Sequence, residues 1–274
     1  MAIEHNMTLR ARGEDFDYVG SIAPSVLPPK RTAKKRKASS KPTAAVRFSV
    51  VSLFSGCGGM DLGFKGGFDV LGRHYPEQPF DLIWANELNA AACRTYRRNI
   101  GDHVHEGDIW EMLDSLPEQA DVVIGGFPCQ DISVNGKGAG VAGKRSGLYR
   151  AMVEVVARIK PKVFVAENVK GLLMKHHADA LRQVLTDFEA LGYEVSYQLY
   201  HAADYGVPQT RERVIIVGTL PGVKSFEAPV PGYKADEYVT AKEALHDLID
   251  AEEDETVNHI RSRANRIPEQ GNRR

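Results

Sequence analysis

The stretch Asp121-Val-Val-Ile-Gly-Gly-Phe-Pro-Cys-Gln-Asp-Ile-Ser133 decides how this chain folds. Its first residues, Asp121 to Ile124, have the short, β-branched composition of an interior parallel strand, and two glycines and a proline end that strand. Cys129 therefore follows the carboxyl end of a buried strand, the edge at which open α/β sheets bind ligands. A free cysteine is most often a small, inert core residue. The small residues around Cys129, however, leave its thiol accessible, which favours a nucleophile.

The residues after Cys129 continue an α/β pattern. The stretch from Asn135 to Gly147 is rich in glycine and basic residues, which predicts a mobile loop. Such a loop could close over a phosphate-bearing substrate or be an ordinary surface loop. A buried strand from Lys162 to Val169 follows, and it ends in Glu167-Asn168. Glu167 is therefore expected at the same sheet edge as Cys129.

Two further strands, Tyr193 to Tyr200 and Val214 to Leu220, are joined by a turn with no room for a crossover helix. The second strand should therefore lie antiparallel to its neighbours in an otherwise mainly parallel, Rossmann-like sheet. Arg211 and Arg213 precede it and enter the sheet from the ligand-binding edge. They could act on a ligand there or form a structural salt bridge.

A glycine-rich turn precedes the central strand in the chain. A predicted strand from Arg47 to Phe54 runs into Ser55-Gly-Cys-Gly-Gly-Met-Asp-Leu-Gly63 and a short helix. Glycines let a backbone approach a ligand closely, although this turn lacks the full dinucleotide spacing and could be only a tight strand-to-helix connection. The next strand, Asp81 to Glu87, ends in an acid. Glu87 then lies where a ribose diol would bind, or it is a helix-start carboxylate.

A third short strand is expected from Val104 to Ile109, with Asp108 as the acid at its end. Three successive strand ends then carry glycine, glutamate and aspartate, which suits a nucleoside with a polar base edge and two ribose hydroxyls. No Gly-Lys-Ser/Thr phosphate loop is present, which disfavours a triphosphate.

The composition predicts an ordinary cytoplasmic protein. The chain has 274 residues, of which 43% are hydrophobic and 26% charged, with a net charge of -1. Its three cysteines are too few and too scattered for a disulfide framework or a thiolate zinc site, and no metal site is expected. No apolar run approaches the roughly 20 residues that span a bilayer, and no signal-peptide core is present, so no membrane partner is expected.

The two ends of the chain differ from its middle. Residues 1–46 contain several prolines and a basic run, which predicts a disordered arm that could contact nucleic acid, serve as an address or be a solvated tail. Residues 47–225 carry the alternating strands and helices, and residues 226–274 are irregular apart from one helical stretch, Thr240 to Ala251.

Seven short motifs follow one another in a defined order. They are Phe54-Ser-Gly-Cys-Gly-Gly59, Asn86-Glu87, Gly107-Asp-Ile109, Gly126-Phe-Pro-Cys-Gln130, Gly147-Leu148, Glu167-Asn-Val169 and Gln209-Thr-Arg-Glu-Arg213. In this order they closely resemble the DNA cytosine-5 methyltransferases of the bacterial restriction-modification type, over roughly residues 47 to 220. The resemblance implies a Rossmann-like class I methyltransferase fold dependent on S-adenosylmethionine, with residues 47–225 as the cofactor-binding and catalytic domain. Its sheet would be mostly parallel with one antiparallel strand.

The resemblance also implies a role for each matching residue. The cofactor would be bound by the glycine turn, with Glu87 at its ribose, Asp108 at its adenine edge, and Ile109 and Pro128 nearby. The turn residues concerned are Phe54, Ser55, Gly56, Cys57, Gly58 and Gly59. Double-stranded DNA would be the substrate, with Gln130, Ser133 and Asn168 in contact with it.

For the chemistry, the resemblance implies that the Cys129 thiolate adds to carbon 6 of a flipped-out cytosine, which makes carbon 5 able to accept the methyl group. Glu167 would hold a proton at N3, and Arg213, with Arg211 beside it, would hold the O2 side of the ring.

The C-terminal stretch departs from the family pattern. Family members continue into a target-recognition domain and return with a Gly-Asn segment, and neither is evident here, so residues 226–274 read as the lead-in to the recognition domain. A second subunit could supply both, or the chain could be a fragment or a truncated gene. The competing functional hypotheses are a non-catalytic module that binds cofactor and DNA, an RNA cytosine methyltransferase, and more weakly a thiol hydrolase.

Overall fold

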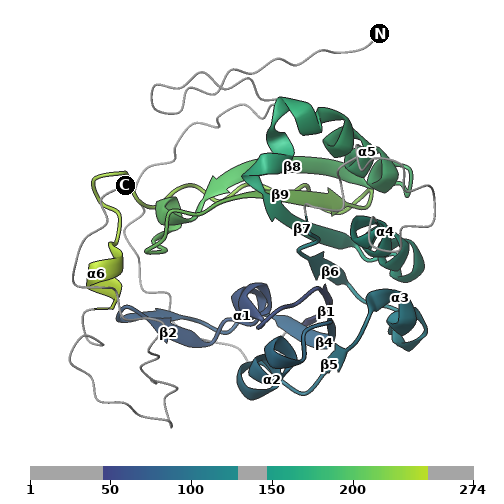
Figure 1. The fold of residues 1–274 in the computed structure, drawn as a ribbon, viewed down its shortest axis with the longest axis horizontal. Coiled ribbons are helices and arrows are strands. Elements are labelled where there is room, and N and C mark those ends of the chain that lie inside the picture. The colour runs from purple at the N-terminus through teal and green to yellow at the C-terminus, as the bar shows by residue number, and fades with distance from the viewer. Residues whose placement is uncertain (1–45, 129–146, 246–274) are drawn as a thin grey trace, which may run out of the picture. The chain divides into compact units, whose positions relative to one another are not determined.

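The structure is a computed structural model that describes residues 46–128 and 147–245 of the chain (Figure 1). The described residues fall into two compact units. The larger contains residues 46–128, 147–201 and 211–230, and the smaller contains residues 202–210 and 231–245. The larger unit holds a seven-stranded sheet with the strand order β5-β4-β1-β6-β7-β9-β8 (Figure 1).

The strands of this sheet are β1 (Phe48–Leu53), β4 (Phe80–Glu87), β5 (Val104–Glu106), β6 (Val122–Gly125), β7 (Val163–Val169), β8 (Glu194–His201) and β9 (Glu212–Thr219). The helices of the larger unit are α1 (Gly59–Lys65), α2 (Ala90–Asn99), α3 (Ile109–Met112), α4 (Leu148–Ile159) and α5 (Ala178–Glu189). The smaller unit contains the short helix α6 (Ala241–Ala244) and the 3-10 turn Ala202–Tyr205.

The sheet is mostly parallel. Strands β5, β4, β1, β6 and β7 all pair in parallel, whereas β9 pairs antiparallel with both β7 and β8. This arrangement confirms the predicted α/β fold and the antiparallel strand that begins near Arg213. Because β9 runs in the opposite direction, its first residues lie at the same edge as the carboxyl ends of the parallel strands.

Helices cover both faces of the sheet because successive residues of a strand point to opposite sides. Val51 of β1 belongs to a core cluster that includes Met152 of α4. Its neighbour Val50 belongs to a separate cluster, against which Met60 and Phe64 of α1 pack. The sheet is therefore the middle layer of a three-layer core.

One local prediction was wrong, and one pair of strands was not anticipated. The third strand ends at Glu106 and not at Asp108, because Asp108 is the N-cap of α3 and its carboxylate accepts the Trp110 backbone N–H at 3.0 Å. A hairpin of β2 (Phe68–Val70) and β3 (Arg73–Tyr75), which the sequence analysis does not anticipate, lies between α1 and β4 in the chain.

The smaller differences lie at element ends and at the limit of the described chain. Helix α5 begins at Ala178, directly after a 3-10 turn over Lys175–His177. The helical stretch predicted from Thr240 begins as α6, capped by the Thr240 hydroxyl, and the rest of it lies outside the described residues. No helix among residues 46–128 and 147–245 has the length and apolar character needed to cross a membrane.

A partly buried polar cluster fixes the amino end of β6. The Asp121 carboxylate accepts hydrogen bonds from the backbone N–H and the hydroxyl of Ser49, both at 2.9 Å, and forms an ion pair with Lys162 at 2.8 Å. Together, Lys162 and the Ser49 donors hold the pKa of the Asp121 carboxyl below its usual range. This cluster joins the strand that leads to Cys129 to both of its neighbours, β1 and β7.

We expect Asp121→Asn to lower the free energy of unfolding by about 1–3 kcal/mol at neutral pH, the range for lost hydrogen bonds to a charged group. A folded-state pKa that is depressed stabilises the protein above the unfolded-state pKa of about 4. This stabilisation is lost as the pH falls through the lower folded-state value. Urea unfolding of the wild type and Asp121→Asn should be measured from neutral to acid pH. The difference between their free energies of unfolding should shrink as the pH falls.

Asp179→Asn is the control, because that carboxylate is 85% exposed and pairs with Arg182 at the surface. Its effect should stay below about 0.5 kcal/mol at every pH. An Asp121→Asn deficit that persists unchanged in acid would contradict the assigned role of the carboxylate.

Candidate functional site

The candidate site lies along the carboxyl edge of the parallel strands. Strand β1 ends in the glycine turn, β4 ends in Glu87, β6 leads into Gly126 and Phe127, and β7 ends near Glu167. The antiparallel strand β9 begins at this edge with Glu212 and Arg213. In an open α/β sheet this edge is where ligands bind, so topology alone brings the predicted residues together.

The glycine turn requires left-handed backbone conformations. Gly56 and Gly58 have φ values of 56° and 87°, and Phe54 also has a positive φ of 54°. A Cβ added at Gly58 would come within 2.5 Å of Ile100 and 3.0 Å of Tyr96, whereas a Cβ added at Gly59 would meet no atom within 4 Å. The turn is therefore packed tightly against α2 on one side and open on the other.

Glu87 holds the glycine turn from the side. Its Oε2 accepts the Gly56 backbone N–H at 2.9 Å, and its Oε1 accepts the Asn89 N–H at 2.8 Å. Both functions considered from the sequence are thus structurally possible, since Glu87 lies beside the turn and also stands at the start of α2. The half-buried carboxylate remains accessible at this edge.

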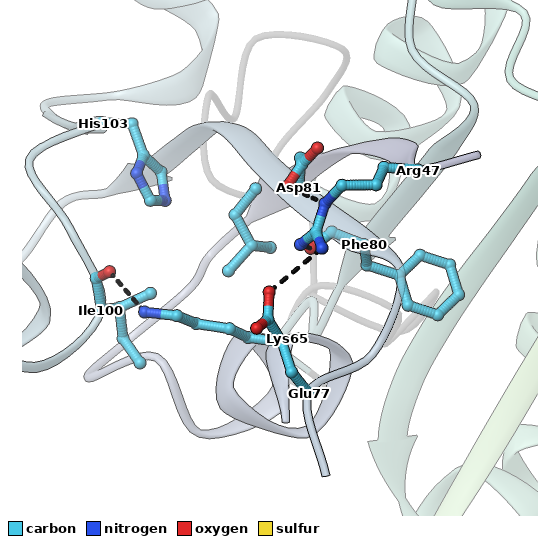
Figure 2. Close-up of a pocket in the computed structure, with 8 residues that line it drawn as sticks. Arg47, Lys65, Glu77, Phe80, Asp81, Ile100 and His103 are labelled. Carbon is cyan, nitrogen blue, oxygen red and sulfur yellow. Dashed lines mark hydrogen bonds and ion pairs between the residues drawn. The ribbon is translucent and has the colours of Figure 1, made fainter. Parts of the chain in front are cut away.

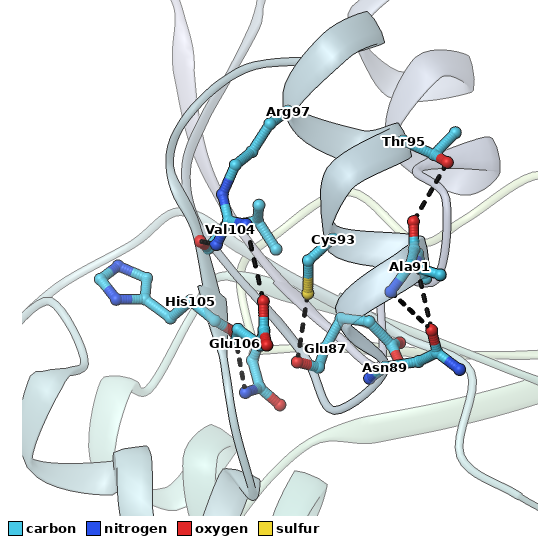
Figure 3. A network of polar contacts seen from close by, with 11 residues as sticks. Glu87, Asn89, Ala91, Cys93, Thr95, Arg97, Val104, His105 and Glu106 are labelled. Atoms are coloured by element: carbon cyan, nitrogen blue, oxygen red, sulfur yellow. Dashed lines mark hydrogen bonds and ion pairs between the residues drawn. The ribbon is translucent and has the colours of Figure 1, made fainter.

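The start of α2 extends this polar network (Figure 3). The Asn89 side chain caps the helix by accepting the N–H groups of Ala91 and Ala92 at 2.9 and 3.1 Å. The Cys93 thiol is buried and donates to the Glu87 carbonyl at 3.4 Å, and burial raises the pKa of this thiol. Cys93 is therefore an inert core residue, in contrast to Cys57, which is exposed on the glycine turn.

Asn86 is a buried residue of this edge whose role was missed in the sequence analysis. Its side chain, 2% exposed, donates to the carbonyls of His105 and Gly107 at 3.3 and 2.9 Å, while its own backbone carbonyl accepts the Ser55 N–H at 3.0 Å. Asn86 thereby joins the glycine turn to the loop that carries Asp108. The Asn86-Glu87 motif names this residue from the sequence, but no sequence signal shows which carbonyls its side chain binds.

Two of the remaining cofactor candidates differ in accessibility. Asp108 is exposed, and one of its carboxylate oxygens accepts the Trp110 N–H at 3.0 Å. Ile109 is only 2% exposed and belongs to the main core cluster, so its side chain supports the loop from beneath.

The end of β6 is tied to the end of β7. The Asn168 side chain, 1% exposed, donates to the Phe127 carbonyl at 3.1 Å, and its oxygen accepts the Val169 N–H at 2.8 Å. Pro128 follows Phe127 and is exposed. The next predicted site residues, Cys129, Gln130 and Ser133, lie outside the described residues, as does the predicted loop up to residue 146.

Glu167 and two arginines form the charged centre of the edge. Arg213 Nε lies 2.6 Å from Glu167 Oε1, and an Arg211 terminal nitrogen lies 3.5 Å from the same oxygen. The closer contact is an ion pair without hydrogen-bond alignment, since Arg213 Nε finds no well-directed acceptor among the described residues. A side chain at Gly126 would approach Glu167 Oε2 to 3.1 Å, so that oxygen faces the strand end leading to Cys129.

Strand register explains why these groups meet. Glu167 is directly opposite Ile215 in the antiparallel pair. Arg213 and Arg211 precede Ile215 by two and four residues, so by strand periodicity they lie on the same face as Glu167. Arg211 and Arg213 therefore form the salt bridge that the sequence analysis gave as an alternative. Their partner is Glu167, which is itself a predicted site residue.

A cavity of about 300 Å³ lies at the opposite, amino end of the sheet (Figure 2). Its charged side chains already have partners: Arg47 pairs with Glu77 and Asp81 at 3.0 and 2.7 Å, and Lys65 donates to the Ile100 carbonyl at 3.3 Å. The cavity therefore offers few unsatisfied groups to a ligand, and the carboxyl edge remains the better candidate.

The chain is similar to several known proteins. The model of the family described as C-5 cytosine-specific DNA methylase matches residues 48–272. The type II methyltransferase M.NgoFVII of Neisseria gonorrhoeae is 40% identical over 236 residues, which cover 81% of this chain and 60% of the relative. The type II methyltransferase M.BspRI of Lysinibacillus sphaericus is 38% identical over 226 residues, 74% of this chain and 53% of the relative.

A solved structure is also similar. It is described as a DNA modification methyltransferase encoded within a prophage of E. coli, with a TM-score of 0.58 and 26% identity, and the match covers 75% of this chain and 56% of that one. The chain thus spans between about half and 60% of the length of these relatives.

The contrast between Gly58 and Gly59 can be tested directly. Gly58→Ala should lower the free energy of unfolding by about 2–5 kcal/mol. The added Cβ is unfavourable in the left-handed conformation of this residue, and it also comes too close to Tyr96 and Ile100. Gly59→Ala, at a position with open space, should change it by less than about 0.5 kcal/mol. Denaturant unfolding of both variants gives the comparison. Equal effects would show that α2 does not constrain the turn.

Proposed function

The chain belongs to the family of C-5 cytosine-specific DNA methylases, and we propose that it transfers a methyl group from S-adenosylmethionine to carbon 5 of cytosine in DNA. The observation that carries the proposal is the order of four neighbouring strands, β4-β1-β6-β7. Their carboxyl ends bring Glu87, the glycine turn, Phe127-Pro128 and Glu167 into one row, and Cys129 is the next residue in the sequence after Pro128. Adjacent strands are about 4.8 Å apart, so a methyl donor, a nucleophile and a ring-binding acid fit side by side.

The described residues fit S-adenosylmethionine. Gly56 and Gly59 leave open space where a side chain would otherwise stand. Glu87 offers a carboxylate beside that space, suited to a ribose diol, and Asp108 offers a second accessible one, suited to the adenine edge. When bound, the cofactor supplies an electrophilic methyl group on its sulfonium.

Cys129 is the proposed nucleophile. Its thiolate adds to carbon 6 of cytosine, and the electron pair of the 5,6 double bond moves into the ring, which makes carbon 5 nucleophilic. After the methyl group is in place, loss of the carbon 5 proton and expulsion of Cys129 restore the aromatic ring. Such a ring is inaccessible within a duplex, so the proposal includes a cytosine that is flipped out of double-stranded DNA.

Glu167 and the arginines are the proposed ring-binding groups. Glu167 holds a proton at N3 and thereby stabilises the ring as electrons enter it. Arg213 binds the O2 side and, with Arg211, orients the Glu167 carboxyl group. The 2.6 Å approach of Arg213 to Oε1 supports this division, because it leaves Oε2 on the Gly126 side of the carboxyl group.

The role of Glu87 predicts a loss of cofactor affinity. Glu87→Ala should weaken S-adenosylmethionine binding by about 1–3 kcal/mol, since it removes a charged acceptor of both the diol and the Gly56 N–H. Calorimetric titration measures this change. Glu106→Ala is the matched control, because Glu106 stands opposite Glu87 in the neighbouring strand and pairs with Arg97 at 3.6 Å. If wild type and Glu87→Ala bind S-adenosylmethionine equally well, Glu87 serves only as a carboxylate at the start of α2.

If Cys129 is the nucleophile, a covalent complex between the protein and DNA can be trapped. With cofactor present, duplex DNA carrying 5-fluorocytosine at randomised sites should form an adduct that survives denaturing electrophoresis, because fluorine at carbon 5 cannot leave as a proton. Cys129→Ser should abolish the adduct. Cys57→Ser and Cys93→Ser should retain it, since one thiol lies on the glycine turn and the other is buried under Glu87.

The outcomes of this experiment separate the competing hypotheses. An adduct that survives Cys129→Ser assigns the nucleophile to another residue. If DNA and cofactor bind but no adduct forms, also with a recognition domain and the Gly-Asn segment supplied by a second subunit, the result favours a non-catalytic module. If an adduct forms equally well on single-stranded RNA, the preference for DNA is wrong.

A further inference from the structure

A fully buried carboxylate lies directly behind the glycine turn. Asp61, in the first turn of α1, is 0% exposed, and its Oδ1 accepts a hydrogen bond from the Tyr96 hydroxyl at 2.7 Å. Within the described part of the chain, its second oxygen has no hydrogen-bond partner. Burial raises the pKa of Asp61, and its interactions with the Tyr96 hydroxyl and, more weakly, with the buried Ser52 side chain oppose that shift. Burying the Asp61 carboxylate lowers the stability of the fold, whereas two apolar side chains at the positions of Asp61 and Tyr96 would carry no such cost.

Tyr96 links this carboxylate to the turn itself. It is also 0% exposed, and the edge of its ring would lie only 3.0 Å from a side-chain carbon at Gly58. Its hydroxyl oxygen is 2.9 Å from His103 Nε2, and the two rings meet edge to face at 5.4 Å between centroids. Since the hydroxyl donates its hydrogen to Asp61, His103 is the donor in the second contact, with its proton on Nε2.

These contacts hold the turn from beneath. Helix α1 begins inside the glycine turn, and α2 begins shortly after Glu87. The Asp61–Tyr96 hydrogen bond therefore joins the two helices whose first residues frame the cofactor space. Glu87 fixes the turn from the side through the Gly56 N–H, and Tyr96 fixes it from below through Gly58.

We propose that Tyr96, oriented by Asp61 and His103, is a positioning residue for S-adenosylmethionine. It holds the backbone of residues 54–59 in the shape that accepts the cofactor, without touching the cofactor itself. The inference rests on the proposed function, because it assigns a purpose to the shape of that turn. It also explains why a polar pair occupies a position where two apolar side chains would pack: a directional hydrogen bond specifies the distance and rotation between α1 and α2 more narrowly than apolar contact does.

Tyr96→Phe tests the proposal, because it removes only the hydroxyl. The variant should bind S-adenosylmethionine roughly 5- to 30-fold more weakly in calorimetry, the range expected when a hydrogen bond to a charged group no longer organises the site. In the cofactor-free protein, the backbone amides of Gly56 and Gly58 should exchange with deuterium faster than in the wild type.

Tyr193→Phe is the matched control. Tyr193 is also a buried tyrosine, 5% exposed, and its hydroxyl donates to the Pro161 carbonyl at 2.7 Å, away from the glycine turn. This variant should lose comparable stability in urea while its cofactor affinity and its turn exchange stay within about twofold of the wild type. The comparison separates positioning from a general loss of stability.

Variants of Asp61 provide a second, independent measurement. Asp61→Asn keeps an oxygen that accepts the Tyr96 hydroxyl and should retain most of the cofactor affinity. Asp61→Leu removes the acceptor and should resemble Tyr96→Phe.

Each outcome decides between explanations. If wild type binds the cofactor and Tyr96→Phe binds it equally, with unchanged exchange of the turn amides, Tyr96 is only a core residue and the inference is overturned. If Tyr193→Phe loses as much affinity as Tyr96→Phe, the effect is one of stability, and the inference is again overturned. If the wild type itself does not bind the cofactor, the proposed function fails first, which is a distinguishable result.

Discussion

The antiparallel pairing of β9 with β7 is the constraint on which the proposed chemistry of this edge depends. It places Ile215 opposite Glu167, so that Arg213, two residues earlier, becomes a diagonal neighbour of the carboxylate on the same face. A slip of one residue would turn both arginines to the other face and leave Glu167 without a cation. A parallel β9 would carry them to the amino edge of the sheet. The direction and register of a single strand thus decide whether the acid and its arginines meet.

The second constraint is the backbone of the glycine turn, which is held from two directions. Glu87 binds the Gly56 N–H from the next strand, and Tyr96 packs under Gly58 from the next helix. The two holding residues belong to one continuous segment, β4 followed by α2, so any movement of that segment would change both contacts together. A site arranged in this way responds to the packing of β4 and α2 as much as to its own residues.

The sequence predicts the parts of the fold that depend on periodicity and on strand ends. Glu87 and Glu167 could be placed because each closes an apolar run, and the direction of β9 follows from a turn too short for a helix. The β2–β3 hairpin could not be predicted, because Leu71 adopts a left-handed φ of 50° that hairpin sequences normally give to glycine or asparagine. Tyr96 also escaped notice, since its hydroxyl partner lies 35 residues away and its spacing in α2 is that of an ordinary core residue.

The distribution of amides and carboxylates along the edge follows from the cost of burying charge. Asn86 and Asn168 occupy equivalent places near the ends of β4 and β7, both are almost fully buried, and each donates its side-chain amide to the carbonyl of an adjacent loop. A neutral amide can satisfy such carbonyls at little desolvation cost, whereas a carboxylate cannot donate to them at all. The charged neighbours of these amides, Glu87 and Glu167, are instead only partly buried, where a ligand can reach them. Structural roles and the proposed chemical roles thus fall on consecutive residues, because alternate side chains of a strand end point to different environments.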